Sequence, residues 1–217
     1  MKFNLWMILW IFVGFSTFAQ SQKDPKAKAI LDGVSQKYQS LKGLQASFEY
    51  TYENEIDGSS QTNSGEVTIK GNSYLLKLDN QEIYNNGNTV WTYIESNGFK
   101  EVTINNVNTQ EDELTPSSVY NMYKKGFNYQ LLGEKNENGK TIQVVELTAE
   151  KANAPFKRVK LMVDKAQKDL IGWEIFDDQG TVFRYKFKDV DTNIDLKDDF
   201  FTFNASNYGK VEVIDLR

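Results

Sequence analysis

The sequence contains no cysteine and no histidine. The missing histidine removes the commonest general base and metal ligand, and the missing cysteine removes the thiol nucleophile, thiolate metal sites and disulfides. A glycine-rich phosphate loop and a Gly-x-Ser-x-Gly turn are also absent from the sequence. We therefore expect a binding protein rather than an enzyme, without a cofactor or a metal ion.

Acidic pairs are the remaining catalytic candidates. Asp177-Asp178 and Asp198-Asp199 are pairs that a hydrolase relying on carboxylates alone, or a calcium site, would use. Their positions favour a structural role, because the first pair lies in a predicted hairpin turn and the second precedes a predicted strand. A hydrolase is the alternative from the enzyme class.

Proline and net positive charge are also scarce. The 3 prolines and 13% aromatic residues in 217 residues indicate one folded domain, which we place at residues 20–217 and expect to be a monomer. The 25 Lys and Arg residues are outnumbered by 30 Asp and Glu residues, which gives a formal charge of −5. This balance argues against a nucleic-acid partner, since such a partner requires a basic face.

The N-terminus has the pattern of a secretory signal peptide. Lys2 gives a basic start, Leu5–Phe15 is an apolar run, and small residues lead to a cleavage site after Ala19. The apolar run is shorter than the roughly 20 residues that span a bilayer, so a signal peptide at 1–19 is favoured over a membrane anchor. Without a cysteine to acylate, the exported protein is not itself a lipoprotein, and we place it in a bacterial periplasm.

Hydrophobic periodicity predicts two helices. Asp24-Pro25 is a helix start, and apolar residues then recur at steps of three and four up to a stop near Gly43. Thr115-Pro116 repeats this start, and a second helix is predicted from there to Gly126.

The rest of the chain alternates with a period of two. Leu44 to Glu53 predicts a long strand with one apolar face. Asn86-Gly87 predicts a two-residue type I′ turn, and the strand after it carries Trp91 and Tyr93 on one face, against which something apolar should lie. Further strands are predicted at 65–70, 74–78, 99–104, 127–132, 141–148, 156–163, 170–176, 181–187, 201–203 and 211–214, and an acidic loop at 105–114.

These elements predict a mainly β protein with helices, of the α+β class. Short connections favour an antiparallel meander, and a sheet of about 11 strands should curl into a barrel or half barrel with the helices against its concave side. The 14 Phe, 11 Tyr and 4 Trp residues either fill the interior or leave a hydrophobic cavity for a ligand, and both possibilities stay open.

Five segments, in this order and spacing, resemble the LolA family of periplasmic lipoprotein carriers. They are Leu44-Gln45-Ala46-Ser47-Phe48, Ser64 to Lys70, Asn86-Gly87-Asn88-Thr89-Val90-Trp91-Thr92-Tyr93, Thr115-Pro116 and Phe201-Thr202-Phe203. The resemblance implies an unclosed antiparallel barrel with helices as a lid over a hydrophobic cavity. It also implies that this cavity holds lipoprotein acyl chains during transport from the inner to the outer membrane.

The resemblance also suggests which residues bind and which partners act. The sheet side of the cavity would be Phe48, Tyr50, Val67, Ile69, Leu76, Leu78, Trp91 and Tyr93, and the lid side Ile30, Leu31, Val34, Val119 and Met122. Many family members carry Arg-Pro after the second strand as a lid latch, where this chain has Lys70-Gly71-Asn72, so Lys70 is the candidate latch. The implied partners are an inner-membrane lipoprotein-releasing ABC transporter and an outer-membrane acceptor.

Two further functions fit the same predicted fold, namely a lipid-sensing regulator of envelope stress and a general lipid-binding protein. Because an uncollapsed cavity costs on the order of 24 cal/mol per Å³, the lid is expected to close inward without cargo.

Overall fold

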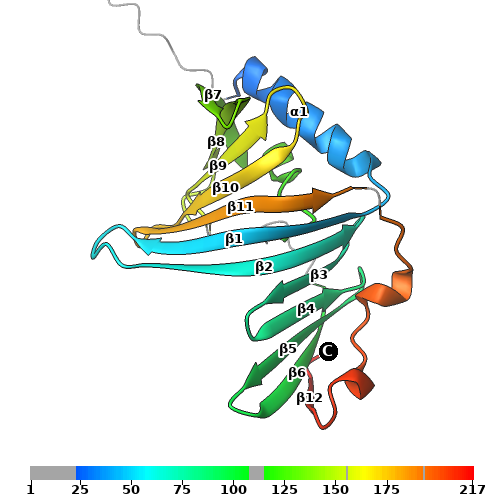
Figure 1. Ribbon diagram of the computed structural model, residues 1–217. Coiled ribbons are helices and arrows are strands. Elements are labelled where there is room, and N and C mark those ends of the chain that lie inside the picture. Colours follow the sequence, from blue (N-terminus) through cyan, green and yellow to red (C-terminus); the bar gives the residue numbers. More distant parts are fainter. Residues whose placement is uncertain (1–22, 108–114, 155, 193) are drawn as a thin grey trace, which may run out of the picture.

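The computed structural model describes residues 23–107, 115–154, 156–192 and 194–217. The predicted signal peptide at 1–19 lies outside the described residues, as does most of the predicted acidic loop at 105–114. The described chain forms one α-helix, α1 (Pro25–Ser40), three short 3₁₀ helices and a single 12-stranded sheet (Figure 1). Within these residues no helix has both the length and the apolar character needed to cross a membrane.

The strands follow the predicted meander closely. They are β1 (Leu44–Asn54), β2 (Ser60–Lys70), β3 (Ser73–Leu78), β4 (Gln81–Asn85), β5 (Thr89–Ser96), β6 (Phe99–Asn106), β7 (Phe127–Glu137), β8 (Lys140–Ala149), β9 (Arg158–Asp164), β10 (Leu170–Phe176), β11 (Thr181–Asp191) and β12 (Glu212–Asp215). Their order in the sheet is β12-β6-β5-β4-β3-β2-β1-β11-β10-β9-β8-β7. Because β12 and β7 are at opposite ends of this order, the curved sheet is unclosed, which confirms the predicted fold class.

Neighbouring strands are antiparallel with one exception. β12 pairs with β6 in parallel, from Glu212 opposite Glu101 to Asp215 opposite Ile104. The predicted strand at 201–203 is wrong, because this stretch follows a 3₁₀ helix, η2 (Asp198–Phe201), and precedes another, η3 (Ala205–Asn207). The chain thus needs a long connection from β11 before β12 can add to the far edge.

The start of α1 is as predicted. The Asp24 carboxylate accepts the backbone N–H of Lys26 at 2.8 Å, and Pro25 occupies the first helical position. The other carboxylate oxygen of Asp24 accepts the N–H of Leu131 in β7 at 3.0 Å, so the cap also attaches the helix to the sheet. This bond from Leu131 is the main cause that lowers the pKa of Asp24. The helix ends at Ser40, slightly before Gly43.

The predicted second helix is wrong. Residues 116–121 form turns, and only η1 (Met122–Lys124) is helical, of the 3₁₀ type. The Ser118 hydroxyl accepts the N–H of Thr115 at 2.9 Å and donates to the Thr115 carbonyl at 3.2 Å. Such local bonds compete with a regular helix, and Asn121 continues the chain of three-residue backbone bonds that Ser118 begins.

The β4–β5 hairpin is present, but its predicted turn type is wrong. Type I′ needs positive φ at both central residues, and here Gly87 has a φ of 91° while Asn86 is not among the residues with positive φ. The Asn86 side chain instead accepts the N–H of Thr89 at 2.9 Å, and the first paired residues are Asn85 and Val90. Asn86 therefore builds a wider loop from its own side chain.

Two other Asn-Gly pairs do make tight turns with positive φ at both residues. Asn97 and Gly98 have φ values of 51° and 80° between β5 and β6, and Asn138 and Gly139 have values of 50° and 76° between β7 and β8. In both hairpins the flanking residues are directly paired, so the loop has two residues.

The largest hydrophobic core lies between α1, the segment 115–126 and β7–β10. Its fully or nearly fully buried members are Ala27, Ile30, Leu31, Val34, Val119, Tyr120, Tyr123, Tyr129, Val145, Leu147, Val159, Leu161, Val163, Leu170 and Ile175. Figure 1 shows α1 lying across this end of the sheet, while β3–β6 and β12 extend away from the helix.

We expect Leu147→Ala to lower the free energy of unfolding by about 3 kcal/mol, since Leu147 is 0% exposed and truncation leaves a cavity. Leu132→Ala, at a residue 48% exposed on the neighbouring strand, should change it by less than about 0.5 kcal/mol. Urea denaturation followed by circular dichroism measures both. Equal losses in the two variants would contradict the packing described.

We expect Asp24→Ala to cost about 1–2 kcal/mol at neutral pH, because both the helix cap and the acceptor for Leu131 are lost. The folded-state pKa of Asp24 is lowered, so its contribution is present above the ordinary aspartate pKa of 3.8 and is lost as pH falls through the folded-state pKa. Unfolding curves of the two proteins should therefore converge in acid. A constant difference down to about pH 2 would contradict this assignment.

Candidate functional site

An apolar cavity of about 150 Å³ lies on the concave side of the sheet. Five strands and the segment that begins at Thr115 enclose it. Its lining residues are Phe48, Tyr50, Val67, Ile69, Leu76, Leu78, Pro116, Trp173, Ile175, Tyr185 and Phe187. All but Pro116 come from strands, so the sheet supplies the walls.

Strand register brings the aromatic lining together. Phe48 pairs with Phe187, and Tyr50 pairs with Tyr185, so four rings from β1 and β11 stand on one face. The ring centroids of Tyr50 and Tyr185 are 6.3 Å apart, and Trp173 stacks on Tyr185 at 5.0 Å. The rings form one continuous aromatic surface.

Gly65 makes room for this surface. It pairs with Phe48 across β1 and β2, and a Cβ atom added there would lie 2.5 Å from the Phe48 ring. A larger residue at position 65 would displace the ring, so glycine is required by the close approach rather than by an unusual φ.

The structure brings six of the eight predicted sheet-side residues to this cavity. They are Phe48, Tyr50, Val67, Ile69, Leu76 and Leu78. The predicted lid residues Ile30, Leu31, Val34 and Val119 are buried in the core beside the cavity, and Met122 packs against that core. That these residues bind a lipid stays a prediction.

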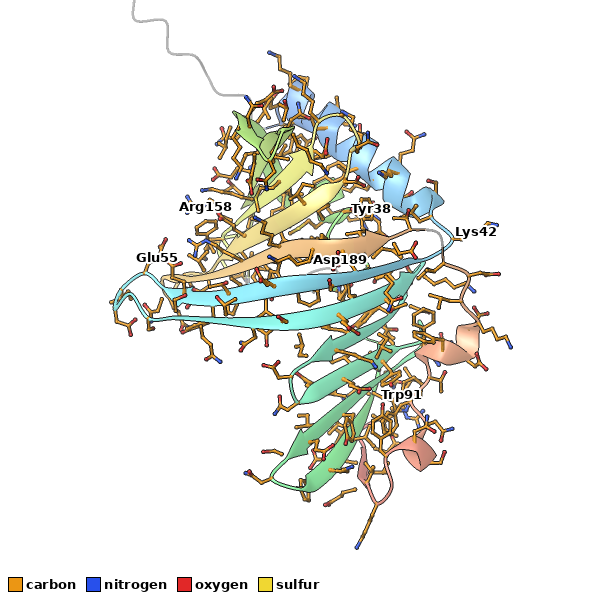
Figure 2. The ribbon with its side chains drawn as sticks, in the orientation of Figure 1. Tyr38, Lys42, Glu55, Trp91, Arg158 and Asp189 are labelled. Carbon is orange, nitrogen blue, oxygen red and sulfur yellow. The ribbon has the colours of Figure 1, made fainter. Side chains whose placement is uncertain are left out.

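Trp91 and Tyr93 lie on the opposite face of the sheet. Trp91 pairs with Tyr84, which pairs with Leu75, whereas the cavity residue is Leu76. Successive residues of a strand point to opposite faces, so one position separates the two sets. Figure 2 shows Trp91 beside the C-terminal segment, far from Tyr38 on α1.

The expected apolar cover over Trp91 and Tyr93 comes from the chain itself. Phe203 stacks on Tyr93 with centroids 5.8 Å apart, and Tyr208 contacts the same ring at 4.4 Å. Tyr84 and Tyr208 share a hydroxyl bond of 2.7 Å. The segment after β11 therefore forms a second, smaller core on the convex face.

Lys70, the last residue of β2, contacts this C-terminal segment rather than the lid. Its ammonium donates to the Leu196 carbonyl at 2.6 Å and pairs with Asp198 at 2.7 Å. These contacts attach the chain between β11 and η2 to the end of β2. Among the bonds of the described residues, Lys70 makes none to α1 or to the segment 115–126, so its predicted role as a lid latch has no support from these contacts.

Side chains other than Lys70 join α1 to the segment 115–126. The Tyr123 hydroxyl donates to Asp32 at 2.6 Å. The Asn121 side-chain oxygen accepts from Ser35 at 2.7 Å and from Gln39 at 2.8 Å. Burial, and then the bond to Asp32, raises the pKa of Tyr123 to about 12, so its hydroxyl stays a donor at neutral pH.

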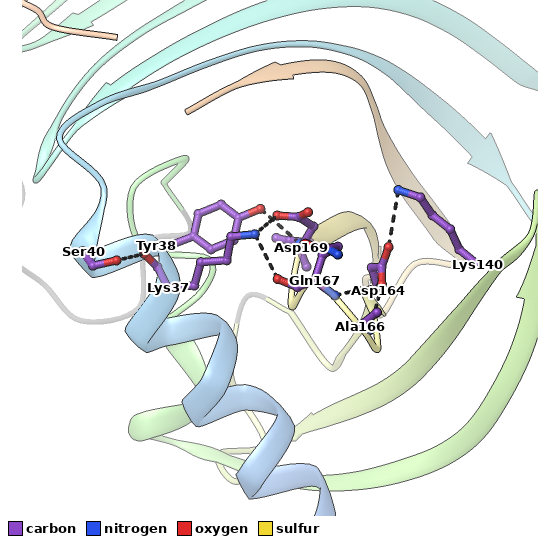
Figure 3. Close-up of polar contacts among 9 residues, drawn as sticks. Lys37, Tyr38, Ser40, Lys140, Asp164, Ala166, Gln167 and Asp169 are labelled. Atoms are coloured by element: carbon purple, nitrogen blue, oxygen red, sulfur yellow. Dashed lines mark hydrogen bonds and ion pairs between the residues drawn. The ribbon is translucent and has the colours of Figure 1, made fainter. Parts of the chain in front are cut away.

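Tyr38 lies where the large core meets a smaller apolar cluster beside the cavity. The buried members of this cavity cluster are Leu44, Ala46, Phe48 and Val67. Its ring stacks on Tyr120 with centroids 5.4 Å apart, and its hydroxyl accepts the N–H of Leu170 at 3.1 Å. Burial is the main cause that raises the pKa of Tyr38 to about 12. Figure 3 shows Tyr38 beside Lys37, which pairs with Asp169 in the β9–β10 connection.

One carboxylate of each acidic pair has a structural partner. The Asp177 carboxylate accepts the N–H groups of Gln179 and Thr181, each at 2.8 Å, and so closes the turn before β11. Burial raises the pKa of Asp177, but these backbone bonds outweigh it and the net pKa is lowered. Asp198 is the partner of Lys70.

Sequence reasoning missed five lining residues, namely Pro116, Trp173, Ile175, Tyr185 and Phe187. The sequence did contain a signal for four of them, because apolar residues alternate within the predicted strands. Trp173 and Ile175 are two residues apart, as are Tyr185 and Phe187, so each pair lies on one face of its strand. Which face of β10 and β11 joins the cavity depends on their pairing, which alternation alone does not give.

Comparisons with known proteins agree with this geometry. Residues 39–204 match the model of the family described as outer membrane lipoprotein carrier protein LolA. A search of curated proteins finds no match.

Several solved structures have a similar fold. An uncharacterized conserved protein from Thermus thermophilus is 14% identical with a TM-score of 0.58, covering 88% of this chain and 99% of that one. A LolA superfamily protein from Nitrosomonas europaea is 15% identical with a TM-score of 0.44, covering 82% and 97%. The lipoprotein LppX from Mycobacterium tuberculosis is 10% identical with a TM-score of 0.49, covering 81% and 100%. The unclosed sheet, its apolar concave cavity and the match over most of the chain together show that this protein belongs to the LolA family of outer membrane lipoprotein carrier proteins.

Proposed function

We propose that this protein is a periplasmic carrier that binds lipoprotein acyl chains and moves them from the inner to the outer membrane. The observation that carries the proposal is the aromatic cavity on the concave face, between β1–β3, β10, β11 and Pro116. Family membership supports it, since the matched family is described as carrying outer-membrane lipoproteins.

The energetics of acyl burial require direct transfer between partners. Each buried CH₂ group contributes about 0.8 kcal/mol to binding. Releasing several acyl chains into water would therefore cost tens of kcal/mol. Loading therefore comes from an inner-membrane lipoprotein-releasing ABC transporter, and unloading goes to an outer-membrane acceptor. The carrier itself needs no catalytic group for either step.

Loading requires the cavity to widen. A volume of about 150 Å³ is below the roughly 300–1,000 Å³ of ordinary ligand pockets. The segment 115–126 is the part that moves in our proposal, because it is built from turns and a short 3₁₀ helix and contributes Pro116 to the lining. Asn121 and Tyr123 hold it to α1 through side-chain bonds that can break without unfolding a helix.

We expect Tyr50→Glu to lower lipoprotein uptake at least about tenfold, because a carboxylate in the cavity must be desolvated against acyl chains. Uptake is measured as lipoprotein released from inner-membrane spheroplasts into a complex with the carrier. Tyr52→Glu is the matched control, since Tyr52 is 39% exposed on the same strand and outside the cavity lining. A folded Tyr50→Glu protein that takes up lipoprotein as well as the unmodified one would refute the proposal.

We expect Asn121→Ala to speed loading about fivefold, because the acceptor shared by Ser35 and Gln39 is removed and each such bond contributes about 0.5–1.5 kcal/mol. Stopped-flow fluorescence of a polarity-sensitive fatty acid analogue measures the rate. Ser117→Ala serves as the control in the same segment, since its hydroxyl bonds to Thr115 rather than to α1. Identical loading rates for all three proteins would exclude this segment as the moving part.

A further inference from the structure

A second cavity, of about 450 Å³, opens where the sheet parts between β10 and β11. The pairing of β10 with β11 runs from Phe176 opposite Val182 to Gly172 opposite Lys186. β11 continues beyond that point to Asp191 along β1. The end of β11 therefore diverges from the start of β10, and the space between them is closed off by the C-terminal turns of α1 and the β7–β8 turn.

Lysines outnumber carboxylates among the residues that line this opening, although two of the lysines pair with carboxylates outside the lining. Its lining holds four lysines, Lys37, Lys140, Lys186 and Lys188, and two carboxylates, Glu137 and Asp169. The formal charge of the lining is 4 − 2 = +2, although the whole chain has a charge of −5. Three separate parts of the fold supply the lysines, so the tertiary structure alone gathers them.

Each ammonium has a carboxylate partner, so a bound anion would share the ammonium with that carboxylate. Lys37 pairs with Asp169 at 2.5 Å and also donates to the Gln167 carbonyl at 2.9 Å, and Lys140 pairs with Asp164 at 3.3 Å (Figure 3). The remaining pairs are Lys186 with Glu137 at 3.0 Å and Lys188 with Glu49 at 2.8 Å.

These ion pairs leave the ammonium groups available. The side chains of Lys140 and Lys186 are 55% and 53% exposed. An exposed pair such as Lys186 with Glu137 contributes only about 0–1 kcal/mol, so a ligand phosphate can take up a donor there without a large loss of stability. Asp164, the partner of Lys140, is buried, but it also accepts the backbone N–H groups of Ala166 and Gln167. Each ammonium has three N–H donors, and one carboxylate does not use them all.

The cationic opening adjoins the apolar cavity. Phe187 lines both spaces, so the two meet at this side chain. Tyr38 lines the opening and packs against both the large core and the cavity cluster. An amphiphile with an anionic headgroup requires an apolar space beside a cationic one, and the two spaces are neighbours at Phe187.

We propose that this opening binds the phosphate headgroup of an anionic amphiphile whose acyl chain occupies the apolar cavity. The ligand class then includes free glycerophospholipids in addition to lipoproteins. Lys140 and Lys186 contact the phosphate, and Lys37 holds the edge of the opening through Asp169. The inference rests on the proposed acyl-binding function, and it adds a headgroup site that this function alone does not require.

The test compares two amphiphiles with one palmitoyl chain each, below their micelle concentrations, by isothermal titration calorimetry. Palmitoyl lysophosphatidylglycerol carries an anionic phosphate, and monopalmitoylglycerol does not. We expect the anionic amphiphile to bind more tightly, and Lys140→Gln/Lys186→Gln to weaken its binding about tenfold, since each exposed charge contact is worth up to about fivefold. Binding of monopalmitoylglycerol should stay within about twofold.

Controls separate local contacts from net charge and folding. Lys77→Gln/Lys151→Gln removes the same charge at two exposed lysines outside the opening and should leave both affinities unchanged. Lys140→Arg/Lys186→Arg should retain the preference for the anionic amphiphile, because the positive charge is kept. Raising the salt concentration from about 0.05 M to about 0.5 M should weaken the binding of the anionic amphiphile and leave that of monopalmitoylglycerol unchanged.

Three other results would overturn the headgroup site. Equal affinities for the two amphiphiles in the unmodified protein would overturn the headgroup site and leave the carrier function standing. Failure of both amphiphiles to bind would overturn the carrier function and this inference with it. Inorganic phosphate binding as tightly as the anionic amphiphile would assign the opening to free phosphate and would overturn the lipid inference.

Discussion

The concave face of the curved sheet is apolar and must be covered, and the rest of the molecule depends on how that cover is made. Over β7–β10 the cover is α1, whose Leu31 and Val34 are 1% exposed and pack into a filled core. Over β1–β3 the apolar face is covered only by the segment around Pro116, and the aromatic side chains there line a cavity. A filled core and a cavity therefore coexist on one face, in different places.

The weak part of the cover is also the part without regular structure. Ser118 and Asn121 favour local bonds over a helix, so the segment 115–126 is held mainly by its contacts with α1 and with β7. Packing of Tyr120 on Tyr38 adds an apolar contact at the same seam. A cover fixed by side chains can shift while α1 keeps its backbone bonds, which suits a cavity that must widen for cargo.

The convex face has its own cover, made by the chain after β11. Phe203 and Tyr208 pack on Tyr93, and Lys70 attaches the start of this segment through Asp198. The segment then returns the chain to the far edge, where β12 pairs with β6. Both faces of the β3–β6 half thus carry large apolar or aromatic side chains, and alternation alone cannot tell which face meets the cavity.

The sequence by itself determined α1, most of the strands and the alternation along them, but not the second predicted helix or the predicted strand at 201–203. The Asp24-Pro25 start of α1 and the period-two pattern from Leu44 are local features, fixed by capping and by the pleat. The placement of Phe48 beside Phe187, the separation of Trp91 from the cavity and the gathering of Lys37 with Lys186 were decided by the tertiary structure. The reason is physical: these relations depend on register and curvature, and a shift of one residue in pairing moves a side chain to the other face of the sheet.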